Sequence, residues 1–107
     1  MEKQSKLFYS VYNDYYGGML TDYQSQLVRK YYDQDMSLAE IGAEYNISPQ
    51  AVRDALRRAE KSLVMMEEKL GLVNKTYRMR KLLIELESVA NDKQKQEIKE
   101  ILAILEE

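Results

Sequence analysis

Hydrophobic residues recur at intervals of three and four along nearly the whole chain, and no stretch alternates strictly over the length of a strand. This spacing matches the α-helical period, so the pattern predicts helices throughout. Composition agrees, because the 107 residues include one proline and four glycines, the residues that most often interrupt helices. We therefore expect an all-α chain that forms one compact domain, or a small domain with an appendage.

Two helices are predicted in the first third of the chain. The first spans about residues 5–16 and ends at Gly17 and Gly18, because glycine favours helix termination. Thr21 is a good N-cap for the second helix, since its hydroxyl can accept a hydrogen bond from a first-turn N–H. The expected core-facing residues are Leu7, Phe8, Val11, Tyr12, Tyr15 and Tyr16 in the first helix, and Tyr23 or Gln24, Leu27, Val28 and Tyr31 in the second.

A third helix and a sharp corner are predicted next. Ser37 begins the helix, and Glu40 completes a capping box three residues later. Asn46 can end it, because Asn adopts the left-handed conformation more readily than most residues. Ser48 then caps a fourth helix, whose first turn accommodates Pro49 because its missing N–H has no intrahelical partner. The third helix is expected to bury Leu38, Ile41, Gly42 and Tyr45.

The corner has the pattern of a helix-turn-helix motif over residues 37–58. Such a motif needs a small residue where the helices cross, a turn residue with positive φ, and apolar residues packed behind the turn. Gly42 is the small residue at the crossing, Asn46 is the turn residue, and Ile47 is the apolar residue just after the turn. Val52 and Leu56 supply the inner face of the second helix. Corners of this kind also occur as pure structure or as protein-docking units, so the motif leaves those alternatives open.

The remainder of the chain predicts one long helix and a helical hairpin. The fourth helix has a heptad-like seam about 34 Å long that Gly71 terminates. Residues 1–71 are therefore expected to form the helix-turn-helix domain, and residues 72–107 a C-terminal extension used for packing or dimerisation. The seam consists of Val52, Leu56, Ala59, Leu63, Met66 and Leu70, and the face expected in the extension consists of Tyr77, Leu82, Leu83, Leu86, Val89 and Ala90.

The outward face of the fourth helix supplies the candidate site. Gln can pair with adenine and Arg with guanine, whereas arginines further along can hold phosphate. The helix N-terminus at Ser48 offers backbone amides to a phosphate. Asp54 opposes such binding, because its carboxylate would face phosphates. The candidate nucleic-acid-binding residues are Ser48, Gln50, Ala51, Arg53, Asp54, Arg57, Arg58 and Lys61.

Charge is distributed unevenly along the chain. The net charge is −2, but residues 48–81 contain nine basic and four acidic side chains, a local balance of +5. Both flanking segments are acidic. Because binding depends on the local field rather than on the total charge, the overall acidity does not exclude a nucleic-acid partner.

The corner and its flanks resemble a known family. "SLAEIGAEYNIS" and "VRDALRRAEKSL" are similar to region 4 of bacterial sigma factors, which reads the −35 promoter element. Residues 1 to about 75 resemble the small YlxM-type bacterial proteins more closely, through Leu20–Thr21, Tyr31–Tyr32 and the same two segments. The expected fold is therefore an all-α, sigma region 4-like helix-turn-helix bundle without a wing, with a long fourth helix and a C-terminal helical hairpin.

The resemblance also implies a function and a cellular setting. It implies a cytoplasmic regulatory protein of Gram-positive bacteria and mollicutes, whose gene lies beside that of the signal recognition particle GTPase. DNA is then the expected partner, with RNA or a signal recognition particle component as alternatives. The chain lacks the other domains of a sigma factor. A lone module of this kind indicates a nucleic-acid-binding regulator, or a non-enzymatic protein-interaction adaptor with the same fold.

"KTYRMRK" is a second basic segment, with Lys75, Arg78, Arg80 and Lys81 around one tyrosine. Basic residues interleaved with an aromatic residue suit phosphate contact and base stacking. A solvated helix face with the tyrosine packed inward explains the same pattern. The nine tyrosines of the chain fit core and interface packing, with a base-stacking platform as the alternative.

Several classes of function are not expected. The chain has no cysteine and no histidine, so thiol chemistry, imidazole catalysis and ordinary zinc sites are excluded. No glycine-rich phosphate loop or paired carboxylates indicate an enzyme, and we expect no catalytic residues, cofactor or metal. No apolar run reaches the length of a membrane span. We also expect a homodimer, because the seam beyond Leu63 and residues 82–105 offer more apolar surface than a thin hairpin can hide.

Overall fold

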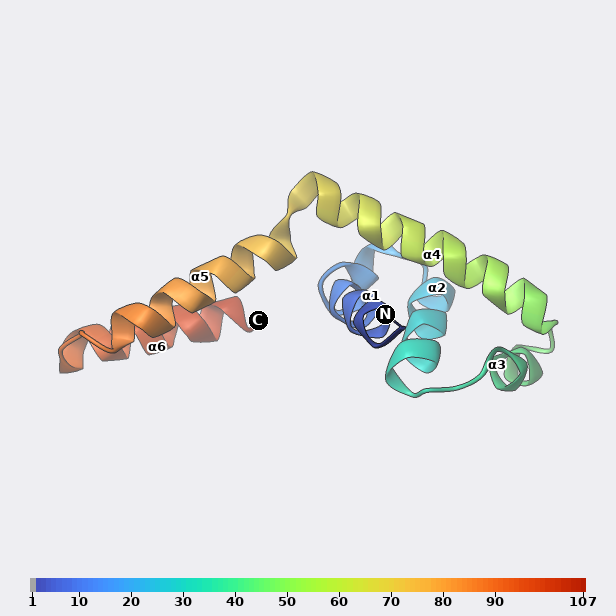
Figure 1. The fold of residues 1–107 in the computed structure, drawn as a ribbon, viewed down its shortest axis with the longest axis horizontal. Helices are drawn as coiled ribbons and strands as arrows, with labels where there is room; N and C mark the ends of the chain where they lie inside the picture. Colours follow the sequence, from blue (N-terminus) through green and yellow to red (C-terminus); the bar gives the residue numbers. More distant parts are fainter. Residues whose placement is uncertain (1) are drawn as a thin grey trace. The chain divides into compact units, whose positions relative to one another are not determined.

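The computed structural model describes residues 2–107, and its side chains are described from Leu7 onward. Over that range every regular element is helical, which confirms the predicted all-α class. The chain separates into two units, one that ends at Gly71 and one that comprises Leu72–Glu107. Each unit is described by itself (Figure 1). None of the described helices combines the length and the apolar character needed to span a membrane.

The N-terminal unit contains four α-helices and two short helical segments. A 3₁₀ segment follows the first α-helix, and a π-helical segment extends the second. The elements are α1 (Glu2–Tyr16), η1 (Gly17–Met19), α2 (Asp22–Val28), η2 (Arg29–Asp33), α3 (Leu38–Tyr45) and α4 (Pro49–Leu70).

Helix α4 is the central helix of this unit. Helices α1, α2 and α3 all pack against it and lie along one side of it (Figure 1). Its seam is buried as predicted over two heptads, and Leu27, Val28 and Ile41 complete the core from α2 and α3. The predicted seam extends too far, because Leu70 is 44% exposed. The buried residues of α4 are Val52, Leu56, Ala59 and Leu63.

Helix α1 packs through a different stripe from the one expected. Leu7 and Phe8 are 66% and 56% exposed, whereas Asn13 and Tyr16 are buried. The Asn13 side chain donates a hydrogen bond to the Ser25 carbonyl, 3.2 Å away, and accepts one from the Ser25 hydroxyl. The prediction for Leu7 and Phe8 was therefore wrong. A hydrophobicity pattern cannot anticipate a buried asparagine whose hydrogen bonds are satisfied by the neighbouring helix.

The start of α2 and the end of α4 follow the prediction. The Thr21 hydroxyl accepts from the Gln24 N–H at 3.1 Å, and the Gln24 side chain accepts from the Thr21 N–H. Gly71 adopts a left-handed conformation with φ 63° and ends α4. These positions were predictable because capping depends on residues only a few positions apart.

The C-terminal unit is an antiparallel hairpin of α5 (Leu72–Glu87) and α6 (Asp92–Leu105). Asn91 caps α6 through a reciprocal pair of hydrogen bonds with Gln94. The buried and partly buried residues include Thr76, Arg80, Leu83 and Glu87 in α5 and Ile98, Leu102 and Leu105 in α6.

The apolar face expected for α5 is mostly uncovered. Tyr77, Leu82, Leu86 and Val89 are each more than half exposed. The prediction of one buried face there was wrong for these residues, because a single partner helix covers only a narrow strip of α5. The strip it covers includes Arg80, whose guanidinium pairs with Glu106 at 2.6 Å.

Candidate functional site

The helix-turn-helix corner has the backbone geometry that its sequence predicts. The Ser37 hydroxyl accepts from the Glu40 N–H at 3.1 Å, and the Glu40 carboxylate accepts from the Ser37 N–H at 3.0 Å. The hydrogen bond from the Ser37 N–H, together with the Ser37 side chain, favours the charged carboxylate and lowers the pKa of Glu40. Asn46 ends α3 in the left-handed region, at φ 58° and ψ 44°. The motif is therefore formed by local capping chemistry at both ends of α3.

Gly42 allows α3 and α4 to approach closely. A Cβ at this position would lie 2.6 Å from the Ile47 carbonyl oxygen. The Ile47 N–H donates to the Gly42 carbonyl oxygen at 2.9 Å, which holds the turn against the helix. The sequence indicated a small residue here, and the contact with backbone leaves room only for glycine.

Ser48 fixes the start of α4. Its hydroxyl accepts from the Ala51 N–H at 3.1 Å, so the side chain of this candidate residue is engaged in capping. Val52 and Leu56 are buried behind the turn, which confirms their predicted inward orientation. The other side of the helix is thereby turned to solvent over its first three turns.

The exposed side of α4 presents two rows of side chains. Arg53, Arg57 and Lys61 follow one another at four-residue intervals and form what we term the basic row. Gln50, Asp54 and Arg58 have the same spacing and form the mixed row. Within the mixed row the Gln50 amide donates to the Asp54 carboxylate at 3.0 Å. Ala51 is partly buried beside them.

The arginines of both rows are free to contact a ligand. Over the described part of the chain, the side chains of Arg53, Arg57 and Arg58 form no hydrogen bond or ion pair. Arg53 and Arg57 border a pocket of about 170 Å³ whose wall includes Tyr31 and Tyr32. Unpaired cationic groups beside aromatic rings suit phosphate or base contact. Acidic side chains in the described residues nowhere gather in a way that would hold a metal ion.

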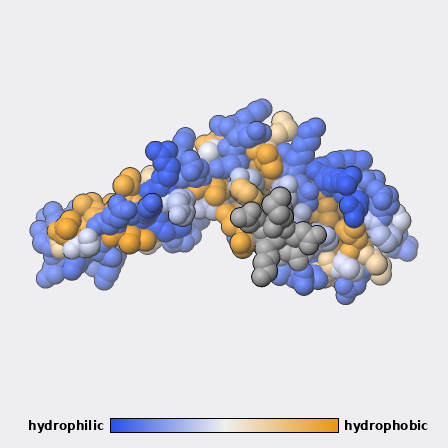
Figure 2. Space-filling model, in the orientation of Figure 1, coloured by the Kyte–Doolittle hydropathy of each residue, from blue (hydrophilic) through white to orange (hydrophobic). Residues whose placement is uncertain are grey.

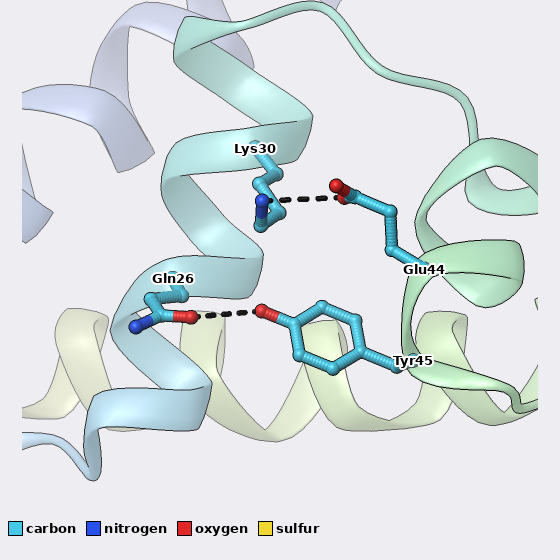
Figure 3. Close-up of polar contacts among 4 residues, drawn as sticks. All are labelled: Gln26, Lys30, Glu44 and Tyr45. Carbon is cyan, nitrogen blue, oxygen red and sulfur yellow. Dashed lines mark hydrogen bonds and ion pairs between the residues drawn. The ribbon is translucent and has the colours of Figure 1, made fainter.

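Two polar contacts fix α3 against α2 and η2 (Figure 3). The Tyr45 hydroxyl donates to the Gln26 side-chain oxygen at 2.9 Å. The Lys30 ammonium pairs with Glu44 at 3.2 Å. Sequence reasoning missed both contacts, because the partners are separated by more than a dozen residues. They help to position the motif and neutralise one of the acidic groups of α3.

Two tyrosine hydroxyls tie α1 and η2 to α4. Tyr16 donates to the Glu67 carboxylate, and Tyr32 donates to the Glu60 carboxylate beside the basic row. Burial and the Glu60 hydrogen bond raise the pKa of Tyr32 well above its ordinary value. Burial likewise raises the pKa of Tyr9, whose ring lies 5.1 Å from that of Tyr32. Glu60 is thus held by Tyr32 one turn from the arginines.

The second basic segment does not present one continuous surface. Lys75, Arg78 and Lys81 are exposed at three-residue intervals on α5. Arg80 points instead toward α6, where it pairs with Glu106. Tyr77 is 62% exposed, so the interpretation in which this tyrosine packs inward is wrong.

Comparison with known proteins agrees with this geometry. A sequence profile of the UPF0122 family, described as "Putative helix-turn-helix protein, YlxM / p13 like", matches residues 1–104. The chain belongs to this family. The YlxM-type resemblance seen in the sequence is thereby confirmed, and the match extends through α5 and most of α6.

Several UPF0122 proteins are similar to the chain. One from Desulforamulus reducens is 50% identical over 74 residues, which are 69% of this chain and 63% of that protein. One from Caldanaerobacter subterraneus is 51% identical over 75 residues, which are 70% of this chain and 64% of that protein. The chain thus matches just under two thirds of these two relatives. One from Thermoanaerobacter sp. is 40% identical over 105 residues, covering 94% of this chain and 87% of that protein.

Proposed function

We propose that the chain is a regulatory nucleic-acid-binding protein of the bacterial cytoplasm and that the first four turns of α4 meet the nucleic acid. The observation that supports this most strongly is the basic row, whose arginines project from a helix-turn-helix without internal partners. Membership of a helix-turn-helix family supports the same conclusion. Duplex DNA is the proposed ligand, because the second helix of such a motif fits the major groove.

The two rows have different proposed roles. Gln50 and Arg53 lie in the first turns of α4, where base edges are within reach of a docked recognition helix. Arg57, Arg58 and Lys61 lie further along and supply phosphate contacts, which contribute affinity without sequence preference. Asp54 lowers the affinity, since its carboxylate faces the same anionic backbone.

The test is a fluorescence titration of labelled duplex DNA and structured RNA, at low and physiological salt. In Arg57→Ala/Arg58→Ala, loss of two phosphate contacts makes the slope of log K against log salt shallower by about 2. Arg53→Ala is expected to weaken binding as well. Lys69→Ala is the matched control, because it removes a cation from the far end of the same helix. Each change introduces alanine into a helix, so helicity is retained.

Equal binding by the wild type and the double variant would reject the proposal, as would a loss in Lys69→Ala as large as that in Arg53→Ala. Preference for RNA over DNA would change the ligand but leave the surface in place.

A protein-interaction adaptor is the second candidate function. The mixed row favours it, because Asp54 and its hydrogen bond with Gln50 put an acidic polar group at the centre of the exposed face. A component of the signal recognition particle pathway is the partner to test, in line with the YlxM-type resemblance. Pull-down from a bacterial lysate with and without nuclease separates the two roles, because partners held through nucleic acid are lost on digestion.

A further inference from the structure

The C-terminal hairpin leaves a row of large apolar side chains exposed on each of its helices. Met79, Leu82 and Leu86 in α5 are 45%, 64% and 54% exposed. Ile101 and Ile104 in α6 are 43% and 62% exposed. We term these five residues the apolar face of the hairpin, and hydrophobic residues are visible on the surface of this unit in Figure 2.

Helical geometry puts both rows on the same side of the hairpin. Each α5 residue of the row directly precedes a residue of the contact stripe, which is formed by Arg80, Leu83 and Glu87. Ile101 and Ile104 likewise directly precede Leu102 and Leu105. The two antiparallel helices are related by an approximate twofold axis perpendicular to the plane that contains both of them. This axis exchanges the helices but keeps each side of the hairpin in place. Residues that directly precede the contact stripe therefore lie on the same side of the hairpin in both helices.

The short connection fixes how the helices align along their length, because α5 ends at Glu87 and α6 begins at Asp92. With one residue advancing as the other recedes, Met79 comes about level with Ile101. The Arg80–Glu106 ion pair, at 2.6 Å, is consistent with this alignment, because each long side chain leans toward the other. The apolar face therefore has Met79 opposite Ile101, with Leu82 and Leu86 nearer the connection on α5 and Ile104 farther from it on α6.

The area of this face is suited to an interface. Five half-exposed large side chains present on the order of 500 Å² of apolar surface, the upper part of the range for the largest patch on a monomer. Two such faces together amount to roughly 1,000 Å², which meets the lower bound for a specific interface. Two copies of the hairpin are therefore sufficient to cover one another.

The charges of the hairpin favour a second copy with each α5 on the partner's α6. Helix α5 contains four basic and two acidic residues, a net +2, whereas residues 92–107 contain three basic and five acidic residues, a net −2. A twofold axis parallel to the helices puts each α5 over an α6 of opposite charge. The alternative, with α5 on α5, opposes like charges.

We propose that two copies of the chain associate through the apolar faces of their hairpins to form an antiparallel four-helix bundle. Met79 of one chain packs against Ile101 of the other, and Leu82, Leu86 and Ile104 extend the contact on either side. The inference does not depend on the proposed ligand of α4. It gives the C-terminal unit a function that the helix-turn-helix does not supply. That function is to bring two recognition helices together in one dimer.

The first test is the mass in solution of the full chain, by light scattering at micromolar concentration. The wild type is expected at about twice 12.6 kDa. Leu82→Glu puts a charge in the centre of the face and is expected to weaken dimerisation at least about 100-fold. Ile84→Glu is the matched control, because Ile84 is 54% exposed but follows the contact stripe and lies on the other side of the hairpin. Circular dichroism checks that both variants remain helical.

The second test uses cysteine pairing, since the chain has no native cysteine. Chains with Met79→Cys mixed with chains with Ile101→Cys are expected to form a mixed disulfide faster than either forms one alone. A wild type of 12.6 kDa throughout overturns the proposal, as do equal effects of Leu82→Glu and Ile84→Glu. Disulfides formed only between two Met79→Cys chains overturn the arrangement of α5 on α6.

Discussion

A Cβ on Gly42 would lie 2.6 Å from the carbonyl oxygen of Ile47. Replacing a helical glycine with alanine normally stabilises a protein by roughly 0.5–1 kcal/mol. Here the new methyl group meets backbone that cannot rotate away, so the corner must open. We expect Gly42→Ala to lower the free energy of unfolding by about 1–3 kcal/mol, measured by urea denaturation.

Gly18→Ala is the control for this prediction, because a Cβ on Gly18 meets nothing within 4 Å. It is expected to leave the free energy of unfolding unchanged or slightly higher. A Gly42→Ala variant as stable as the wild type would show that the turn relaxes without cost and that close approach is not the reason for glycine.

Asn46 provides a second test of the corner, because its φ of 58° lies in the left-handed region. Valine tolerates this conformation poorly, and we expect Asn46→Val to lower the free energy of unfolding by about 1–2 kcal/mol. Asn46→Gly is expected to match or exceed the wild type, since glycine adopts positive φ freely. Equal stability of the valine and glycine variants, measured by thermal unfolding, would contradict the role assigned to φ.

The corner could be predicted from the sequence because its determinants are local. Ser37, Gly42, Asn46 and Ser48 act on backbone within a few residues of themselves, so their residue types alone specify caps, a crossing and a turn. The inward side of α4 followed from the spacing of its apolar residues. The exposed position of the arginines could be predicted as well, because they occupy the side of the helix opposite its buried residues.

The stripes through which α1 and α5 pack could not be predicted in the same way. Both helices have apolar residues around much of their circumference, so periodicity does not select which side is covered. In α1 the choice depends on hydrogen bonds of Asn13 with Ser25, and in α5 it includes the pairing of Arg80 with Glu106, just beyond α6. Such choices depend on partners distant in sequence, which a local pattern does not contain.

The Tyr32–Glu60 hydrogen bond predicts a stability that falls at alkaline pH. Burial and this bond raise the pKa of Tyr32 in the folded chain above its ordinary value of 10. The contribution is therefore complete below pH 10 and is lost as the pH rises beyond it, because the unfolded chain releases the proton first. We expect Tyr32→Phe to lower the free energy of unfolding by about 1 kcal/mol at neutral pH.

The same variant is expected to flatten the loss of stability above pH 10, measured by urea denaturation across the alkaline range. Tyr77→Phe is the control, since it removes a phenol that is 62% exposed and lies outside the N-terminal unit. Identical alkaline profiles for the wild type and Tyr32→Phe would contradict the assignment, and the decline would then have to arise from other tyrosines such as Tyr9 or Tyr12.

Asp54 allows the two proposed roles of the α4 surface to be separated. Removing its carboxylate takes one negative charge from the nucleic-acid face and releases the Gln50 amide. We expect Asp54→Ala to raise the affinity for duplex DNA about two- to fivefold, the factor for unit charges several ångströms apart in water. Glu68→Ala makes the same charge change two helical turns beyond Lys61 and is expected to have a smaller effect in the same fluorescence titration. An Asp54→Ala variant that binds nucleic acid no better but loses a protein partner in lysate pull-downs would instead assign this surface to the adaptor function.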